Sequence, residues 1–522
     1  MPSATRALPL VAAYDLPKTA VVGALSVMAW ISLYLRSRDG EQISFPLCGP
    51  IVALLAVSAL SWFTPWSNVS TVSSPPRPEP ILHGVNTHYF LYALGAMLAG
   101  FSFFWYGANL RGDGRQQTGD GRPAAVLGPR SSVNLLWLAP AAIAAAYAFT
   151  PWLGITSTFG NQERGSAMMA LAVGITIHYV VQSSRSKVQG SKFKVQSFLF
   201  SVMLAPLFLF LWQGQMRSAM AGLGIGFCVW LWFKGSRVKR FKVQGFKGSP
   251  CGVRAHYSTG SRFTILFILL SLLIALWLLP AASYFPDYFA LGNTRPAVWE
   301  QAWKESQISD LKFQNLFGLG LGQWRLYAQQ WIHDPGFRVE DWGYWRELHN
   351  DYLQLLIEAG PLALAAFLYL LWRVLWTTED RRRTTGDGTQ GTISGPRSPV
   401  DALIVGLIAV LVNAFFLFPF QLPIAAAWFW LVAGIYAGPE IGSPPKGHGA
   451  RRDLRPEGGF GRSARRPKAL ADGRVGRLLL VIALAQAVWA GAQALHLAAE
   501  WRLYQMDAVA ASALYPWDYK YD

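Results

Sequence analysis

Long apolar segments alternate with short polar ones along most of the chain. A transmembrane helix needs about 17 to 25 consecutive, mostly apolar residues. Segments of about this length span residues 18–35, 46–63, 88–108, 133–150, 166–182, 197–213, 218–233, 263–281, 352–372, 400–418, 422–437 and 478–496. The pattern predicts an all-α polytopic membrane protein with about 12 transmembrane helices, and a count of about ten to thirteen fits the loose boundaries.

One long polar interruption, residues 282–350, divides the apolar pattern into parts. Residues 1–281 are predicted to hold transmembrane helices 1–8 with basic cytoplasmic loops, and residues 351–497 to hold helices 9–12. The interruption itself is expected to be one large, mainly helical loop, where chemistry in water can take place. The tail, 498–522, has helical apolar spacing and is either the start of a helical repeat or a short interfacial helix.

Composition and charge agree with a membrane protein and give its orientation. The chain is 52% hydrophobic with a mean hydropathy of +0.25, and its formal charge is +17. The charge does not indicate nucleic-acid binding, because Lys and Arg collect in alternate loops as the positive-inside rule requires. These loops begin near Arg36, Arg111, Arg185, Lys234, Arg373 and Lys446. Both termini and the large loop are therefore expected outside the cytoplasm, in the periplasm if the organism has one.

The cysteines and acidic residues predict neither a disulfide framework nor a metal site. Cys48 and Cys228 fall in predicted spans and Cys251 in a cytoplasmic loop, with no zinc-binding spacing. No Asp-x-Asp pair occurs in a predicted outer loop. We therefore expect no metal and no cofactor. The first apolar segment lacks the pattern of a cleaved signal peptide and is expected to be retained as a span.

Polar groups gather where the ninth predicted span begins. Asn350 and Asp351 are both favoured N-cap residues, so the simplest interpretation is that one of them caps this helix. His349 comes directly before it, where the helix dipole keeps imidazole neutral and attracts anions. Glu358 follows about 10 Å into the span. An ionisable group at that depth is either functional or the structural partner of an arginine.

Two arginines are predicted to lie at the same outer face. Arg217 is the only basic residue in its outer turn, where it either anchors the interface or binds an anionic ligand. Arg295 and Trp299 are four residues apart on a predicted helix, 294–306. The glycine run that follows, 317–322, has neither the preceding strand nor the Lys-Ser/Thr pair of a nucleotide-binding loop, so nucleotide binding is not expected.

Together these segments resemble the O-antigen ligase and polymerase family over residues 155–372. The matching residues occur in the order Thr158-Phe159-Gly160-Asn161, Arg217, Arg295 with Trp299, Phe317 to Gly322, and His349-Asn350 with Leu353-Gln354, Glu358 and Gly360. Two places depart from the family pattern. Gln162-Glu163-Arg164 stands where a further Pro-Asn pair is common, and Ser218 stands where glycine is frequent.

The resemblance implies a GT-C-like glycosyltransferase of the bacterial inner membrane with its active site at the periplasmic face. It would move a glycan from undecaprenyl diphosphate to an acceptor hydroxyl, such as that of lipid A-core. The departing diphosphate needs cations, for which Arg217 and Arg295 are the candidates, while His349 would orient or deprotonate the acceptor. Glu358 is expected to hold His349 or an arginine. Substrate contacts are expected from Asn161, Trp299, Gly318, Gly320, Asn350 and Glu358.

Three alternatives stay open at this point. The acceptor of a polymerase is another lipid-linked repeat unit of O-antigen or exopolysaccharide, and that of a protein O-oligosaccharyltransferase is a Ser or Thr side chain. A polysaccharide-related transporter is an alternative of another class. The sequence favours a transferase over a transporter because it shows no inverted halves and few ionisable residues at mid-membrane. The expected partners are a lipid-linked glycan, its acceptor and membrane lipid, but no nucleic acid.

Overall fold

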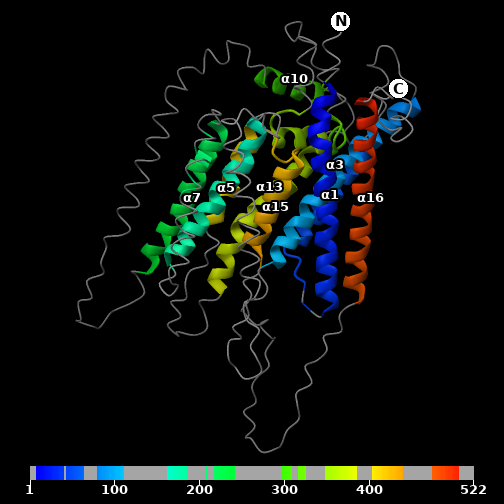
Figure 1. Cartoon of the computed structure of the whole chain (residues 1–522). Coiled ribbons are helices and arrows are strands. Elements are labelled where there is room, and N and C mark those ends of the chain that lie inside the picture. The colour runs from blue at the N-terminus through cyan, green and yellow to red at the C-terminus, as the bar shows by residue number, and fades with distance from the viewer. Residues whose placement is uncertain are drawn as a thin grey trace, which may run out of the picture.

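A computed structural model gives the structure of the protein (Figure 1). It describes residues 8–39, 41, 43–63, 79–110, 162–185, 202, 204, 207–208, 211, 217–241, 295–307, 316–324, 328, 347–384, 402–438 and 473–504. The predicted spans 133–150 and 263–281, most of the predicted span 197–213, and Asn161 lie outside the described residues. The same holds for the tail beyond Tyr504.

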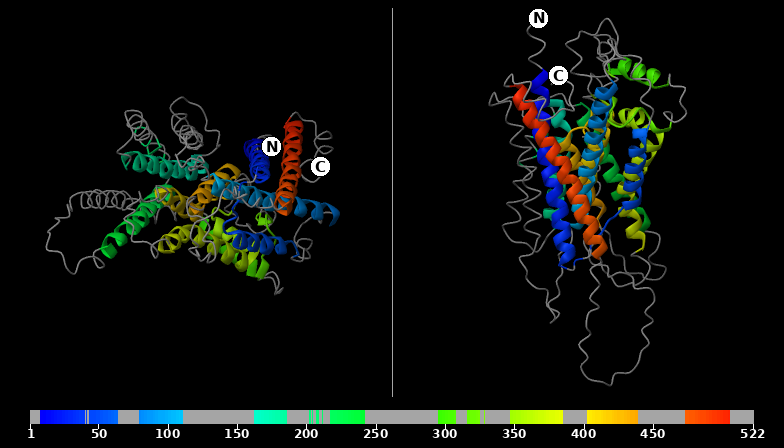
Figure 2. Two further views of the ribbon diagram at one scale, coloured as in Figure 1. Left: turned by 90° about the horizontal axis from the view of Figure 1, so that it is seen from below. Right: turned by 90° about the vertical axis from the view of Figure 1, so that its right-hand side faces the viewer.

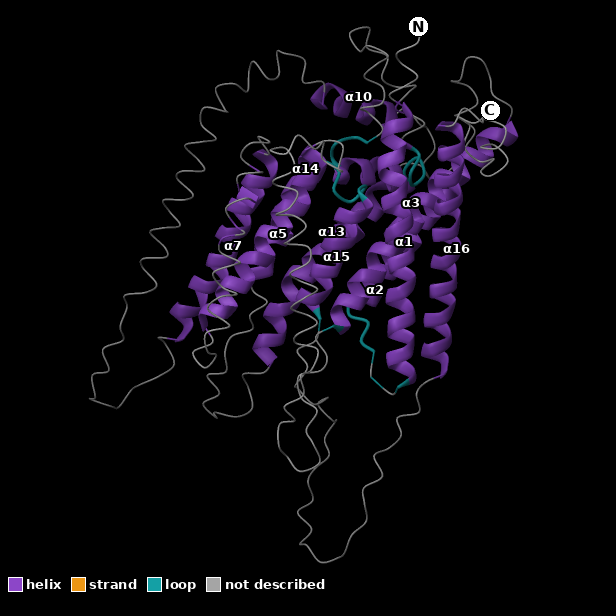
Figure 3. Ribbon diagram, viewed as in Figure 1, coloured by secondary structure: helices purple, strands orange, loops and turns teal. Residues whose placement is uncertain are grey.

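Regular structure in the described residues is helical throughout, without strands (Figure 3). The α-helices are α1 (Leu8–Arg38), α2 (Cys48–Leu60), α3 (Glu79–Asn109), α5 (Gln162–Arg185), α7 (Arg217–Phe241), α10 (Arg295–Gln307), α13 (Asp351–Thr384), α14 (Leu403–Phe416), α15 (Pro423–Ala437) and α16 (Gly473–Tyr504). A 3₁₀ turn, η2 (Ser61–Phe63), extends α2. The all-α prediction is therefore confirmed for the part of the chain that the structure describes.

Four described helices are long and apolar enough to cross a membrane. They contain the segments Lys18–Arg38, Tyr89–Asn109, Asp351–Trp376 and Val475–Ala499. Shorter apolar helices cover Cys48–Phe63, Gly165–His178, Arg217–Leu231, Leu403–Phe416 and Pro423–Ala437. Large apolar side chains are exposed on the long helices, with Leu484 at 66% and Val488 at 68% on α16. These features indicate a membrane-embedded helical protein, and the count of about twelve crossings stays a prediction.

Helices α1, α3, α5, α7, α13 and α15 run in one direction and α2, α14 and α16 in the other, which defines two ends of the bundle (Figure 1). At the end that α10 occupies, here named the α10 end, the last turn of α14 lies against the first residues of α5 and α7. The opposite end, here named the basic end, receives the last turn of α1, with Arg36 and Arg38, and the first turns of α16, with Arg477. Arg36 also donates to the final carbonyl of α3, at Asn109, over 2.9 Å. The positive-inside rule would place this basic end in the cytoplasm.

The helices of the bundle pack in four groups (Figure 2). Helices α1 and α16 lie side by side, α3 packs on α15, α2 packs on α13, and α14 packs on both α5 and α7. The contact between α7 and α14 is close because Gly222 and Gly226 present no side chain to it. A Cβ atom on either glycine would meet the carbonyl oxygen of Ala409 or Val405 at 2.6 or 2.5 Å. This small-xxx-small pattern brings the backbone of α7, which begins with Arg217, directly against α14.

Candidate functional site

A single asparagine joins three helices at the α10 end. Asn413 is fully buried in the last turn of α14, in an otherwise apolar helix. Its Nδ2 donates to Ser166 Oγ in α5 over 2.8 Å, and its Oδ1 accepts from Ser218 Oγ in α7 over 2.8 Å. Because a buried amide must satisfy its hydrogen bonds inside a membrane, this pair fixes the starts of α5 and α7 against α14.

Arg217 is the first residue of α7 and is half-buried beside this junction. Its neighbour Ser218 makes the bond to Asn413. Among the residues that the structure describes, no carboxylate pairs with Arg217. A guanidinium in that position, at the positive end of a helix, is suited to an anionic ligand.

His349 lies buried just ahead of α13, at 2% exposure. Its backbone is left-handed, with φ 55°, a conformation that non-glycine residues rarely adopt and that occurs often at functional sites. The ring lies 4.8 Å from that of Phe418, edge to face, and Nδ1 is 2.8 Å from the carbonyl oxygen of Glu347. Since a carbonyl only accepts, Nδ1 carries the proton of that bond, and Nε2 is the nitrogen with the basic lone pair.

Hydrogen bonds at the start of α13 show which of two residues caps this helix. Leu353 N–H donates to Asn350 Oδ1 over 3.0 Å, which is N-capping geometry, so the prediction of a cap is confirmed for Asn350. Asp351 has a different task, because its Oδ2 accepts from Phe420 N–H over 2.9 Å. This bond fixes the turn between α14 and α15 to the first residue of α13. The predicted contact of Asn350 with substrate stays a prediction.

Trp299 connects α10 to the histidine segment. Its Nε1 donates to the Leu348 carbonyl over 2.6 Å, and its ring lies 6.5 Å from that of Phe415 in an edge-on contact. The helix predicted at 294–306 is observed as α10, with Arg295 as its first residue, one turn before Trp299. Apolar contacts support this docking: Val298, Ala302, Trp324, Ala328, Leu348 and Ile357 form one buried cluster.

The glycine run closes onto a break in α13. Gly360 has φ 81° and ψ 174°, and residue 361 is proline, which has no N–H to donate to the Ile357 carbonyl. The loop supplies the missing donors: Leu319 N–H donates to Ile357 O over 2.9 Å and Gly320 N–H to Glu358 O over 2.8 Å. Gly318, Gly320 and Gly322 all have positive φ, so the run fits this path because it is made of glycine.

The Glu358 carboxylate completes the same docking. Its Oε2 accepts from Gly322 N–H over 3.0 Å, and its Oε1 accepts from Trp324 N–H over 3.0 Å and from Gln354 Nε2 over 3.1 Å. Gln354 Oε1 in turn accepts from Leu348 N–H over 3.1 Å. Glu358 thus positions the glycine loop and, through Gln354, the residue next to His349. The expected contact of Glu358 with His349 or an arginine stays a prediction.

The end of α14 connects three of the predicted segments. Asn413 binds the neighbour of Arg217, Phe415 contacts Trp299, and Phe418 contacts His349. The side chain of Arg295 and all of Asn161 lie outside the described residues. The sequence did not predict a role for the connecting residues, which are Asn413, Phe415, Phe418 and Phe420. Asn413 had a usable signal, since it is the one hydrogen-bonding side chain between Leu403 and Phe416.

The described residues contain no group of three or more His, Cys, Asp or Glu side chains that could hold a metal ion. The described groups in this region are an imidazole, a guanidinium, carboxylates, backbone N–H groups and aromatic rings. Compared with known proteins, the sequence matches no protein-family model and no curated protein.

Proposed function

We propose that the protein is a membrane glycosyltransferase of the O-antigen ligase type, which moves a glycan from undecaprenyl diphosphate to an acceptor hydroxyl at the periplasmic face. The observation that supports this most is the meeting at the end of α14 of three segments distant in sequence. These are the start of α7 with Arg217, the α10 helix with Trp299, and the His349 segment. These segments contain a cation, an aromatic ring and a base.

The proposed reaction is a single displacement. The acceptor oxygen attacks the anomeric carbon, the bond from that carbon to the diphosphate oxygen breaks, and the lipid diphosphate leaves with the electron pair. His349 Nε2 takes the proton of the attacking hydroxyl, a role that contributes about 10² to 10⁴ in rate. Arg217, together with Arg295 at the start of α10, would stabilise the negative charge of the leaving diphosphate. One displacement inverts the anomeric configuration.

Aromatic surface beside the polar groups supports a substrate that is part sugar and part lipid. Trp299 is half-buried next to Phe415, whose exposed fraction is 48%, and Phe416 follows with 42%. Aromatic faces suit sugar rings, while exposed phenylalanines at a membrane surface suit a polyprenyl chain. A diphosphate between them would face the starts of α7 and α13, both positive ends of helix dipoles.

Transfer by the purified protein tests this proposal. Undecaprenyl-diphosphate-linked glycan is offered with lipid A-core, with a second lipid-linked repeat unit and with an acceptor peptide, and the glycosylated product and the released carrier are both quantified. Formation of a new glycosidic bond excludes a transporter, and the acceptor that reacts separates ligase, polymerase and protein glycosylation. Absence of product with all three acceptors would refute the proposal.

Matched variants assign the roles. Arg217→Ala should lower transfer by at least about 10²-fold, the cost of removing one group that stabilises the transition-state oxyanion. Arg502→Ala, which removes an exposed arginine from the last turn of α16, should leave transfer unchanged. His349→Ala should lower turnover by about 10²-fold or more while donor binding is retained. Normal turnover by His349→Ala would eliminate its role as base.

A further inference from the structure

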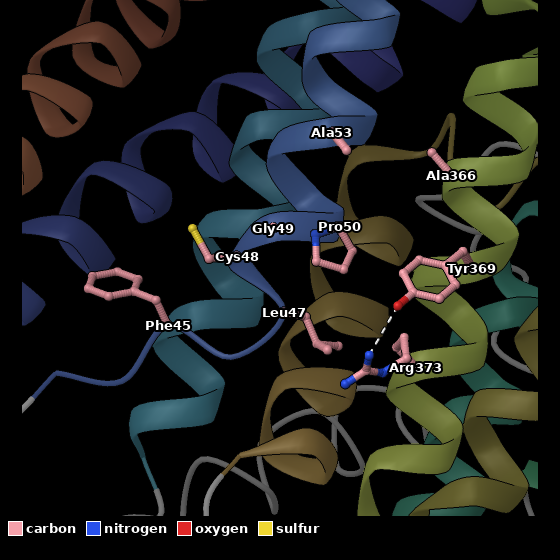
Figure 4. A pocket seen from close by; sticks show the side chains of 9 residues that line it. All are labelled: Phe45, Leu47, Cys48, Gly49, Pro50, Ala53, Ala366, Tyr369 and Arg373. Atoms are coloured by element: carbon pink, nitrogen blue, oxygen red, sulfur yellow. Dashed lines mark hydrogen bonds between the residues drawn. The ribbon is translucent and has the colours of Figure 1, made fainter.

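A hollow lies far from the site just described, between the start of α2 and the last third of the apolar span of α13 (Figure 4). Its volume is about 580 Å³, within the range of small-ligand pockets. The lining residues are Phe45, Leu47, Cys48, Gly49, Pro50, Ala53, Ala366, Tyr369 and Arg373. Arg373 is 22 residues beyond Asp351, so by helical rise the hollow is about 33 Å from the His349 site.

The polar side of this hollow is positive. Arg373 Nη1 donates to Tyr369 Oη over 3.0 Å, and both side chains point from α13 toward Leu47 and Pro50 (Figure 4). Opposite them α2 begins at Cys48 without a side-chain cap, so its first N–H groups add the positive end of a helix dipole. None of the nine lining residues is acidic. Two positive sources that face each other across open space favour an anion between them.

The remaining walls are apolar, and Arg373 lies three residues before the end of the apolar segment Asp351–Trp376, where a spanning helix reaches the lipid headgroups. Ala53 and Ala366 lead from the arginine toward the middle of the bundle, where Leu362 and Val52 are exposed at 44% and 52%. Trp372 is exposed at 55% and stacks on Trp376 with ring centroids 4.8 Å apart. Tryptophan is enriched where the bilayer meets water.

From this combination we propose that the hollow binds one anionic phospholipid of the leaflet at the basic end, with the phosphate on Arg373 and Tyr369 and an acyl chain along α2 and α13. The charge of the polar side matches a phosphate group, and the apolar walls match the chain that a free phosphate lacks. The site is independent of the proposed glycosyl transfer. A bound lipid would, however, brace the same two helices whose other ends hold the glycine loop, since Ser61 Oγ, one residue after α2, accepts from Leu321 N–H over 3.0 Å.

Native mass spectrometry of the full-length protein in detergent tests the proposal by binding alone. Delipidated protein is titrated with phosphatidylglycerol, phosphatidylcholine and inorganic phosphate. We expect one phosphatidylglycerol per chain to bind more tightly than phosphatidylcholine. Arg373→Gln should weaken that binding about tenfold or more, the value of a hydrogen bond to a charged group. Arg477→Gln, which removes an exposed basic residue at the same end, should leave it unchanged.

A second variant tests the apolar wall of the hollow independently of the charge of Arg373. Ala53 is exposed, so Ala53→Phe should be tolerated, and its ring would fill the apolar wall and displace the lipid while Arg373 remains. Equal binding of phosphatidylglycerol by the wild type and both variants would overturn the proposal. So would equal affinity for phosphatidylcholine, or displacement of the lipid by an equal concentration of inorganic phosphate. Because no glycan enters the assay, its outcome does not depend on the proposed enzyme activity.

Discussion

Replacing Glu358 with glutamine changes one carboxylate oxygen to an NH2 group. The carboxylate of Glu358 accepts hydrogen bonds from two backbone N–H groups and one side-chain amide. The two carboxylate oxygens receive Gly322 N–H and Trp324 N–H over 3.0 Å each, and the second oxygen also receives Gln354 Nε2. Glutamine has one acceptor oxygen and one NH2 group, so in either orientation the NH2 group faces a backbone N–H. At least one buried donor is left without an acceptor, which costs about 1 to 3 kcal/mol.

This cost should appear locally, in the glycine loop. Hydrogen exchange followed by mass spectrometry measures the free energy of opening of residues 316–324, and a loss of about 1 to 3 kcal/mol accelerates exchange there by about 5- to 150-fold. A peptide from α14 should exchange at its wild-type rate in the same sample. The matched control is Glu300→Gln on α10. It removes a carboxylate whose partner is the exposed Lys304, at 2.6 Å, and it should leave the loop unchanged.

Unchanged exchange of the loop in Glu358→Gln would refute the inference that Glu358 holds it. Accelerated exchange of the whole protein would also count against a local role, because it would mean that the substitution destabilises the bundle. Transfer activity gives a further readout. If Glu358 acts by positioning the glycine loop and the Leu348 segment, its replacement should lower turnover. Across a series of variants, turnover should then decrease together with the protection of the loop from hydrogen exchange.

Three further outcomes are expected. Trp299→Phe keeps an aromatic ring but loses the bond to the Leu348 carbonyl, so turnover should fall about fivefold, for about 1 kcal/mol, in a steady-state transfer assay. Asn413→Ala removes both interhelical bonds at the end of α14, worth about 0.6 to 1.7 kcal/mol each, and should lower the thermal unfolding midpoint in detergent by several degrees. In a variant without the native cysteines, Trp303→Cys should react with an impermeant maleimide in intact cells, whereas Arg38→Cys should react only after permeabilisation. The reverse result would refute the predicted orientation.

Residues close together in the sequence were sufficient to predict the individual helices of the site. A polar Asn-Asp pair before an apolar run predicted the start of α13, and the structure begins that helix at Asp351 with Asn350 as its cap. The helix predicted at 294–306 is observed as α10, Arg295–Gln307. These features depend on neighbours within one or two helical turns, so the sequence contains all the information that determines them.

The connections between these parts could not be predicted, because they depend on partners far apart in the chain. Asn413 lies 247 residues from Ser166 and 195 from Ser218, and nothing in the local sequence of α14 indicates which helices it joins. The separation of Glu358 from Trp324 is 34 residues. A buried polar residue in an apolar helix predicts that a partner exists, but the identity of that partner is set by the packing of whole helices.

The glycine run and the Glu358-x-Gly360-Pro361 segment become intelligible only as a pair. A proline at 361 would leave the Ile357 carbonyl without a donor inside an apolar span, which is costly unless another N–H replaces the lost one. The N–H of Leu319 does so, and it can approach because Gly360 and Gly318 have no Cβ atoms; one on Gly318 would meet the Ile357 oxygen at 2.5 Å. The break in α13 is therefore what holds the loop, and the loop is what makes the break tolerable. This mutual support fixes the loop beside the segment that carries His349, as the proposed transfer to a precisely placed hydroxyl would require.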